Sequence, residues 1–225
     1  MSLRRRLASA AAMLALLGGC AGGPPPPDWE IEAHGALDAY VRHALEGKAR
    51  LAERDFERAR AALARTGRAE LLARAELTRC ALRVASLMFE PCVGFDPLRA
   101  DAPPREQTYA DFLAGRWSAL DPALLPARYQ AVVQAGAASE ATLAAIEDPR
   151  SRLIAAGALF RVGRLSPAGI ALARETASAQ GWRRPLLAWH GVEIERAQAA
   201  GDTALADRHR RSVERILGTP APAAR

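Results

Sequence analysis

The stretch from Asp148 to Pro185 reads DPRSRLIAAGALFRVGRLSPAGIALARETASAQGWRRP, and prolines recur in it every 18 residues. Two of them follow a residue that caps helices well, because a side-chain oxygen accepts a hydrogen bond from a free N–H of the first turn. Proline is favoured as the first helical residue, where its missing N–H costs nothing. The stretch therefore predicts helices that begin at a fixed interval. The capped prolines are Pro149 after Asp148 and Pro167 after Ser166, and the third proline is Pro185.

Glycines close the same helices. Gly163 and Gly181 are also 18 residues apart, and glycine readily takes the left-handed conformation that ends a helix. Gly201 closes the third helix, and Asp202 supplies the next cap in the same phase. Each unit is a helix with a short turn, and two units form a helical hairpin. The expected helices cover residues 149–162, 167–180, 185–200 and 203–217.

Helical periodicity extends toward the N-terminus. Apolar residues recur at spacings of three and four, as on one face of an amphipathic helix, and Ala, Leu, Arg and Glu dominate the sequence. The segment 89–105 contains four prolines and cannot form one helix, so we expect it to be irregular. The other expected helices cover residues 31–46, 48–65, 68–87, 106–115, 123–135 and 140–146.

These helices predict an all-α domain over residues 30–217, built from helical hairpins. A hairpin that repeats at this length indicates a solenoid of stacked repeats. Small or apolar residues occupy the helix crossings of the first hairpin, at Ala156, Leu159, Ala168 and Leu172. In this the chain resembles the tetratricopeptide repeat, although no hairpin carries the full set of that family's residues. The alternative is an irregular, non-repetitive helical bundle.

The first 20 residues have the pattern of a secretory signal. Three arginines, residues 4–6, precede an uncharged run from Leu7 to Leu17, which is shorter than the ~20 apolar residues that span a membrane. The sequence Leu17-Gly18-Gly19-Cys20 follows. This stretch resembles the lipobox of bacterial lipoproteins, which predicts a signal peptide over residues 1–19. The alternative is an ordinary cleaved signal with an incidental cysteine.

The resemblance to lipoproteins implies a location. In that family the new N-terminal cysteine, here Cys20, carries covalent lipid, and two or more acyl chains give stable membrane anchoring. An Asp after the cysteine retains such proteins at the inner membrane, whereas this chain has Ala21. The resemblance therefore implies an outer-membrane protein that faces the periplasm. Residues 20–29, rich in Gly and Pro, form the expected tether, and residues 218–225 form the expected disordered tail.

Net charge gives little support to a nucleic-acid partner. The formal charge is +6, but Arg4, Arg5 and Arg6 supply half of it and would leave with the signal peptide. The mature domain is thus only weakly basic. We expect its partners to be the membrane, through the lipid anchor, and an unknown envelope protein or peptide, with no nucleic acid.

Cys80 and Cys92 remain once Cys20 is assigned to lipid. An even pair in an oxidising compartment predicts a disulfide. The helix up to residue 87 and the short segment that follows it are long enough to bring the two sulfurs together. The alternative is a pair of buried thiols.

The chain contains few residues in patterns typical of catalysis or metal binding. The four histidines, residues 34, 43, 190 and 209, lack the spacing of three or four that lets helical neighbours share a metal ion. The sequence contains no Gly-x-Ser-x-Gly, no His-Glu-x-x-His and no phosphate-binding glycine loop. We therefore predict no catalytic residue, no metal and no cofactor apart from the lipid on Cys20.

One cluster is a candidate interaction patch: Trp182, Arg183, Arg184 and Trp189. Trp and Arg are enriched in the energetic centres of protein interfaces, and Trp189 lies within about two turns of Trp182. The alternative is that both tryptophans pack the junction between hairpins.

Taken together, the sequence predicts a non-catalytic adaptor or assembly factor that holds an envelope protein or peptide in a groove. Stacked helical hairpins form extended concave surfaces, which is the physical basis for this hypothesis. Two alternatives stay open: a periplasmic cell-wall enzyme or its regulatory subunit, and a purely structural lipoprotein. Convergent carboxylates in a deep pocket would favour the enzyme, whereas an open concave face lined by Arg and aromatic residues would favour the adaptor.

The lipobox leads to a direct prediction. Cys20→Ser removes the only thiol that can form the thioether, so palmitate labelling and membrane retention should both be lost. Labelling in growing cells, followed by membrane fractionation, measures this. Labelling of the Cys20→Ser protein equal to that of the wild type would contradict the lipobox assignment.

Overall fold

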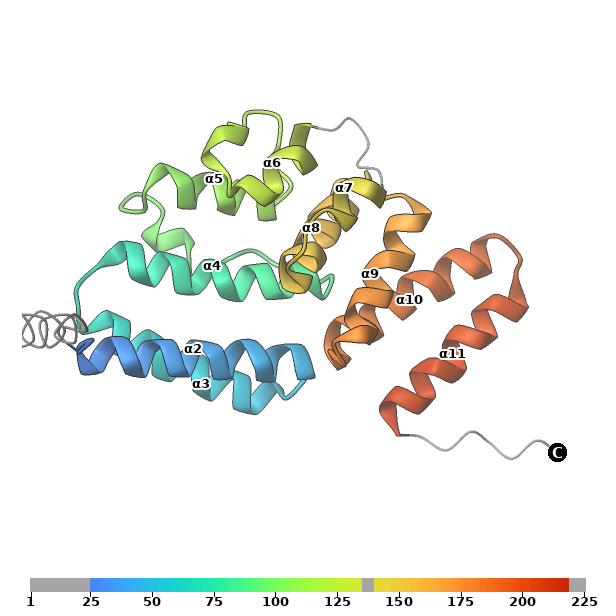
Figure 1. The fold of residues 1–225 in the computed structure, drawn as a ribbon, viewed down its shortest axis with the longest axis horizontal. Helices are drawn as coiled ribbons and strands as arrows, with labels where there is room; N and C mark the ends of the chain where they lie inside the picture. Colours follow the sequence, from blue (N-terminus) through green and yellow to red (C-terminus); the bar gives the residue numbers. More distant parts are fainter. Residues whose placement is uncertain (1–24, 135–139, 219–225) are drawn as a thin grey trace, which may run out of the picture.

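The caps at Asp148, Ser166 and Asp202 start helices in the structure, a computed structural model that describes residues 25–134 and 140–218 (Figure 1). Each cap side chain accepts a hydrogen bond from a backbone N–H three residues later. The closing glycines at positions 163, 181 and 201 adopt φ values of 68°, 65° and 74°. The predicted interval of 18 residues is therefore confirmed for the helices that begin at Pro149 and Pro167. The capped helices are α8 (Pro149–Arg161), α9 (Pro167–Ala179) and α11 (Thr203–Leu217).

The helix between α9 and α11 departs from the predicted start. α10 (Arg183–Ala199) begins two residues before Pro185, and its N-cap Trp182 makes no side-chain cap hydrogen bond. Proline remains compatible with this position because the N–H groups of the first turn have no partner within the helix. The prediction of a helix that starts at residue 185 is thus wrong by two residues.

The N-terminal hairpin forms as its sequence pattern predicts. α2 (Asp28–Glu46) and α3 (Ala49–Ala64) are joined at Gly47, which has a φ of 80°. The rings of Tyr40 and Phe56 pack between them with centroids 5.0 Å apart. His43 Nδ1 and Asp55 Oδ2 lie 2.6 Å apart and tie the same two helices together.

The middle of the chain contains shorter helices. α4 (Ala69–Ala85) is followed by an irregular segment with a 3₁₀ turn at Asp96–Leu98, then by α5 (Pro104–Leu113). The expected helix over residues 123–135 is shorter than predicted: residues 122–124 form a 3₁₀ turn, and α6 covers Ala127–Gln134. Pro126 explains the break, because proline drives the preceding residue away from helical geometry. A single short turn, α7 (Glu140–Ala144), precedes α8.

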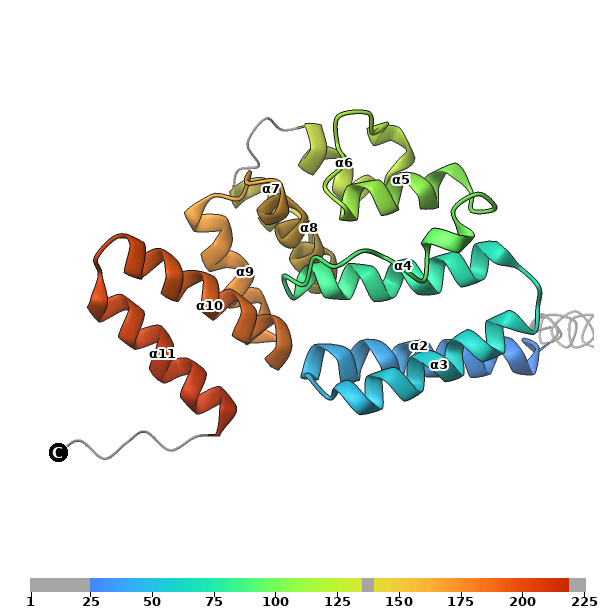
Figure 2. The ribbon, with the colours of Figure 1, turned by 180° about the vertical axis from the view of Figure 1, so that it is seen from behind.

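α4 lies in the middle of the arrangement. Figures 1 and 2 show it between the α2–α3 hairpin on one side and α5 with α6 on the other, while α8 crosses near its C-terminal end. It contributes to both hydrophobic clusters of the protein. Leu77 and Val84 belong to the larger cluster, and Ala75 and Leu82 belong to the cluster of the N-terminal hairpin. Trp182 packs against both clusters.

The crossing of α4 and α8 depends on Gly157. A Cβ atom at this residue would lie within van der Waals overlap of the Val84 carbonyl, at 2.1 Å from its oxygen. That carbonyl also accepts the N–H of Leu87, which closes the end of α4. The backbone of α8 therefore rests directly on the last turn of α4, a contact that only glycine permits.

The predicted disulfide is present. Cys80 and Cys92 are joined, with their Cα atoms 5.8 Å apart. The bond holds the irregular segment against α4, where Gly94 covers the carboxylate of Glu76: a Cβ at Gly94 would be 2.1 Å from Glu76 Oε2. Arg60 Nε lies 3.3 Å from the other carboxylate oxygen of Glu76. Burial raises the pKa of Glu76 above its usual value.

The all-α prediction is confirmed over the described residues, which contain ten α-helices and no β-strand. Consecutive helices pack as hairpin-like neighbours, α2 with α3 and each of α8, α9 and α10 with the next. Whether these hairpins are tetratricopeptide repeats stays a prediction. The predicted signal peptide and most of the tail lie outside the described residues.

Gly157 gives a paired prediction about stability. Gly157→Ala forces a methyl group into the Val84 carbonyl, and overpacking of this kind costs about 1–3 kcal/mol of unfolding free energy. Gly191, also inside a helix, is the matched control because a Cβ there meets nothing within 4 Å. Gly191→Ala should stabilise the protein by about 0.5–1 kcal/mol. Urea unfolding measures both, and equal effects of the two changes would contradict the close crossing.

Candidate functional site

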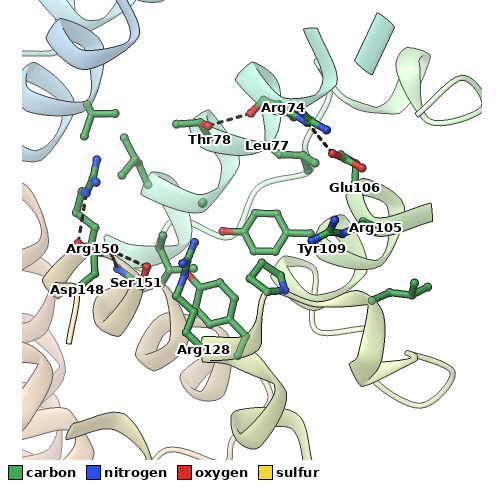
Figure 3. A pocket seen from close by; sticks show the side chains of 17 residues that line it. Arg74, Leu77, Thr78, Arg105, Glu106, Tyr109, Arg128, Asp148, Arg150 and Ser151 are labelled. Atoms are coloured by element: carbon green, nitrogen blue, oxygen red, sulfur yellow. Dashed lines mark hydrogen bonds and ion pairs between the residues drawn. The ribbon is translucent and has the colours of Figure 1, made fainter. Parts of the chain in front are cut away.

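A cavity of about 500 Å³ opens on the face of α4 that lies away from the disulfide (Figure 3). Its walls are α4, α5, the start of α6 and the N-terminal turn of α8, with Val41 contributed by α2. The five helices that meet here come from separate parts of the chain. The cavity is thus a product of the packing around α4 rather than of any local motif.

Four arginines line this cavity, and all four are exposed: Arg74, Arg105, Arg128 and Arg150. Arg74 donates to Glu106 at 2.7 Å, and Arg150 Nε lies 3.7 Å from Asp148 Oδ1. Among the residues that the structure describes, Arg105 and Arg128 form no salt bridge, and Arg128 acts on Asp148 only at longer range. The cavity therefore carries positive charge that its own carboxylates do not fully balance.

Both carboxylates of the cavity already have structural roles. Asp148 accepts hydrogen bonds from the Ser151 N–H at 2.9 Å and the Ser151 hydroxyl at 2.7 Å. Burial alone would raise the pKa of Asp148, but these hydrogen bonds, with Arg150 and Arg128, hold it below its usual value. It thus remains ionised and serves as the cap of α8.

Glu106 has one carboxylate oxygen engaged and one free. Its Oε1 accepts from Arg74, whereas its Oε2 is buried and has no hydrogen-bond partner within the described part of the chain. A buried acceptor without a donor costs roughly 1–3 kcal/mol. Within the described residues the donor to Glu106 is Arg74, and Oε2 is shielded from solvent.

Two tyrosines form the aromatic part of the cavity. The rings of Tyr109 and Tyr129 stack with centroids 5.8 Å apart, and Arg128 lies over the Tyr129 ring at 5.4 Å. Burial raises the pKa of Tyr109 well above its usual value, and the neighbouring Tyr129 adds to the shift. The Tyr109 side chain, which crosses the cavity in Figure 3, is therefore a neutral hydroxyl at every physiological pH.

This arrangement suits binding of anionic groups better than acid–base chemistry. General acid–base catalysis needs a titratable group whose pKa lies near the working pH, whereas the pKa of Asp148 is held below its usual value. The Ser151 hydroxyl is committed to Asp148 rather than to a base. Glu76, whose pKa burial raises, lies beneath Gly94 and does not line the cavity.

The sequence-predicted patch is not a surface patch. Trp189 has an exposed fraction of 0% and meets Phe160 edge-on, with centroids 5.8 Å apart. Trp182 is partly buried between the two hydrophobic clusters. The tryptophans thus pack the junction, as the alternative interpretation had it, and the prediction that Trp189 contacts a partner is wrong. Only Arg183 is exposed, while Arg184 is partly buried.

The sequence did not single out the residues of the cavity. Arg105, Arg128 and Arg150 are three of many arginines, and each looks like part of a solvated helix face. The one available signal was local: residues 126–129 and 148–151 each combine a proline with an arginine at the start of a helix. The lipobox residues Leu17, Gly18, Gly19 and Cys20 lie outside the described residues.

Comparisons with known proteins give no family. No protein-family model matches the chain, and neither does any curated protein or solved structure at a significant level. Within the described ranges no helix is long and apolar enough to cross a membrane, and no three potential metal ligands converge. The features of this chain that bear on function are thus its N-terminal pattern and the geometry of the cavity.

A second titratable cluster joins the last two helices. His190 of α10 and His209 of α11 face each other with 3.0 Å between their Nδ1 atoms. Burial, and then the charge of His209, lower the pKa of His190 to about 4; Arg174 and Arg215 act in the same direction. Burial likewise lowers the pKa of His209, against the opposing effect of Glu193.

The histidine pair predicts a pH dependence. Unfolded histidine takes up a proton near pH 6.5, whereas folded His190 resists it until about pH 4. The unfolded state therefore binds more protons in this window, and stability should fall as pH falls from 6.5 to 4. His209→Gln, which removes the second charge, should make this fall shallower. Urea unfolding across the window measures the slopes, and identical slopes would contradict the coupling.

Proposed function

We propose that this protein is a lipoprotein of the bacterial cell envelope, anchored through Cys20 at the outer membrane and facing the periplasm. Its role is that of a non-catalytic adaptor or assembly factor, which binds a segment of another envelope protein or peptide. The anchor rests on the sequence pattern of residues 4–20. The binding role rests on the cavity beside α4.

The observation that carries the proposal is the charge of an open, aromatic-lined cavity. Arg105 and Arg128 form no salt bridge in the described ranges, and the stacked rings of Tyr109 and Tyr129 supply the aromatic wall. Such a surface favours acidic side chains, because arginine pairs with carboxylates through planar, charge-assisted hydrogen bonds. A periplasmic enzyme would need reactive groups that converge in the cavity, whereas Asp148 and Ser151 are occupied with each other.

The start of the domain is compatible with a tether. Residues 25–27 are exposed prolines, and the last of them adopts φ −65° and ψ 151°, an extended geometry that precedes α2. Consecutive prolines act as semi-rigid spacers of about 3.1 Å per residue. A spacer of this kind would hold the cavity away from the membrane surface, where a partner segment can reach it.

Site-specific photo-cross-linking in intact cells tests the proposal. A photoreactive residue in place of Thr78, half-buried on the cavity wall, should capture an envelope protein. The same residue in place of Arg211, exposed on α11, is the matched control. Arg105→Glu with Arg128→Glu should reduce the Thr78 product several-fold, because the favourable charge is reversed.

Two outcomes would contradict the adaptor. Products identical to those from position 211 would mean that the cavity holds no partner of its own. A Thr78 product that the charge reversal leaves unchanged would mean that the arginines do not bind the partner. Circular dichroism of the purified variants confirms that their helices are intact.

A further inference from the structure

A second hollow, of about 450 Å³, lies next to the first one. It is lined by the first part of α2, the end of α3 and the first half of α4. Arg74 and Thr78 line both hollows, and Figure 3 shows these two side chains at the edge of the first. The two hollows therefore adjoin along one face of α4. We refer to them together as the α4 groove.

The two ends of the α4 groove differ in chemistry. The second hollow presents partly exposed apolar side chains, those of Trp29, Leu37 and Leu71. The first presents the arginines and tyrosines already described. Apolar surface favours an apolar side chain of a ligand, and the arginines favour carboxylates. A ligand that fills both ends must combine the two properties.

The length of the groove limits the size of such a ligand. Lining residues of α4 extend from Leu71 to Leu82, and a helix rises 1.5 Å per residue, which gives about 17 Å. An extended polypeptide covers roughly 3.3 Å per residue. A segment of about five residues therefore spans the α4 groove from the apolar end to the basic end.

The chemistry of the two ends indicates a polypeptide rather than an inorganic anion. A free phosphate or sulfate would occupy only the basic hollow and would leave the apolar side chains of Trp29, Leu37 and Leu71 uncovered. A peptide brings apolar and acidic side chains together in one ligand.

We infer that the α4 groove binds an extended segment of the partner that carries an apolar side chain at one end and, about four residues away, two or more carboxylates. This inference rests on the proposed adaptor role and specifies the peptide pattern that the groove recognises. We call this pattern, an apolar side chain followed by carboxylates, the ligand code. The apolar side chain occupies the hollow beside Trp29 and Leu71. The carboxylates pair with Arg105 and Arg128.

Fluorescence anisotropy with labelled peptides tests this code on the purified domain that follows Cys20. The probe is Leu-Trp-Gly-Ser-Asp-Asp-Asp, and the first control peptide replaces the three Asp by Asn. The second replaces Leu-Trp by Ser-Ser. Each control should bind about tenfold more weakly than the probe, and binding of the probe should weaken as salt concentration rises.

Protein variants test which residues read the code. Arg105→Glu with Arg128→Glu should weaken probe binding by about tenfold or more, while Leu71→Ser should weaken only peptides that contain Leu-Trp. The matched control is Arg196→Glu with Arg211→Glu, which removes the same charge from exposed positions on α10 and α11. This control should bind the probe as the wild type does.

The outcomes separate this inference from the adaptor role. Equal binding of the Asp and Asn peptides, or equal loss in the matched control, overturns the ligand code. If no peptide binds while position 78 still cross-links a partner in cells, the code is also wrong but the adaptor stands. If both peptide binding and cross-linking fail, neither proposal survives.

Discussion

The contact between Gly157 and the Val84 carbonyl determines how the two halves of this protein meet. The first half ends with α4, and the second begins with α8. Without a side chain at residue 157, the backbone of α8 lies directly on the last turn of α4. Leu153 and Leu159, both with an exposed fraction of 0%, are buried in the larger hydrophobic cluster along the same helix. The orientation of α8 then sets where its capped N-terminal turn lies, and with it the positions of Asp148 and Arg150.

Opposite faces of α4 have different roles: one is covered by the irregular segment, and the other lines the groove. Successive helical residues are about 100° apart, so Thr78 and Cys80 point to nearly opposite sides. The Cys80 side is covered by the irregular segment that the disulfide with Cys92 holds in place. The Thr78 side forms the wall of the groove. Because the disulfide lies behind this wall, it can stabilise α4 without narrowing the groove.

Much of the fold followed from local features of the sequence. The caps at Asp148 and Ser166 act within three residues of themselves, so their effect is readable without any tertiary information. Errors arose where a distant contact or a proline competed with the local pattern. Trp182 starts α10 earlier than Pro185 indicates, and Pro126 delays α6.

The groove could not be predicted in the same way. Its arginines come from helices that meet only after the chain has folded, and nothing in a single helix distinguishes Arg128 from a solvated surface residue. Trp189 shows the opposite error. Tryptophan is common at interfaces, so the sequence suggested a contact with a partner, but the Trp189 ring is buried in the core. Burial at the α9–α10 junction depends on how hairpins stack, which local periodicity does not specify.

Hydrogen exchange of the free protein, followed by mass spectrometry, tests most directly whether the α4–α8 contact unites the two halves. If it does, amides of residues 77–85 and 153–159 should exchange last and at matching rates, because both open only on global unfolding. The ends of α2 and α11 should exchange earlier. Exchange of α4 and α8 at clearly different rates would show that the two halves open independently and would contradict this view of the fold.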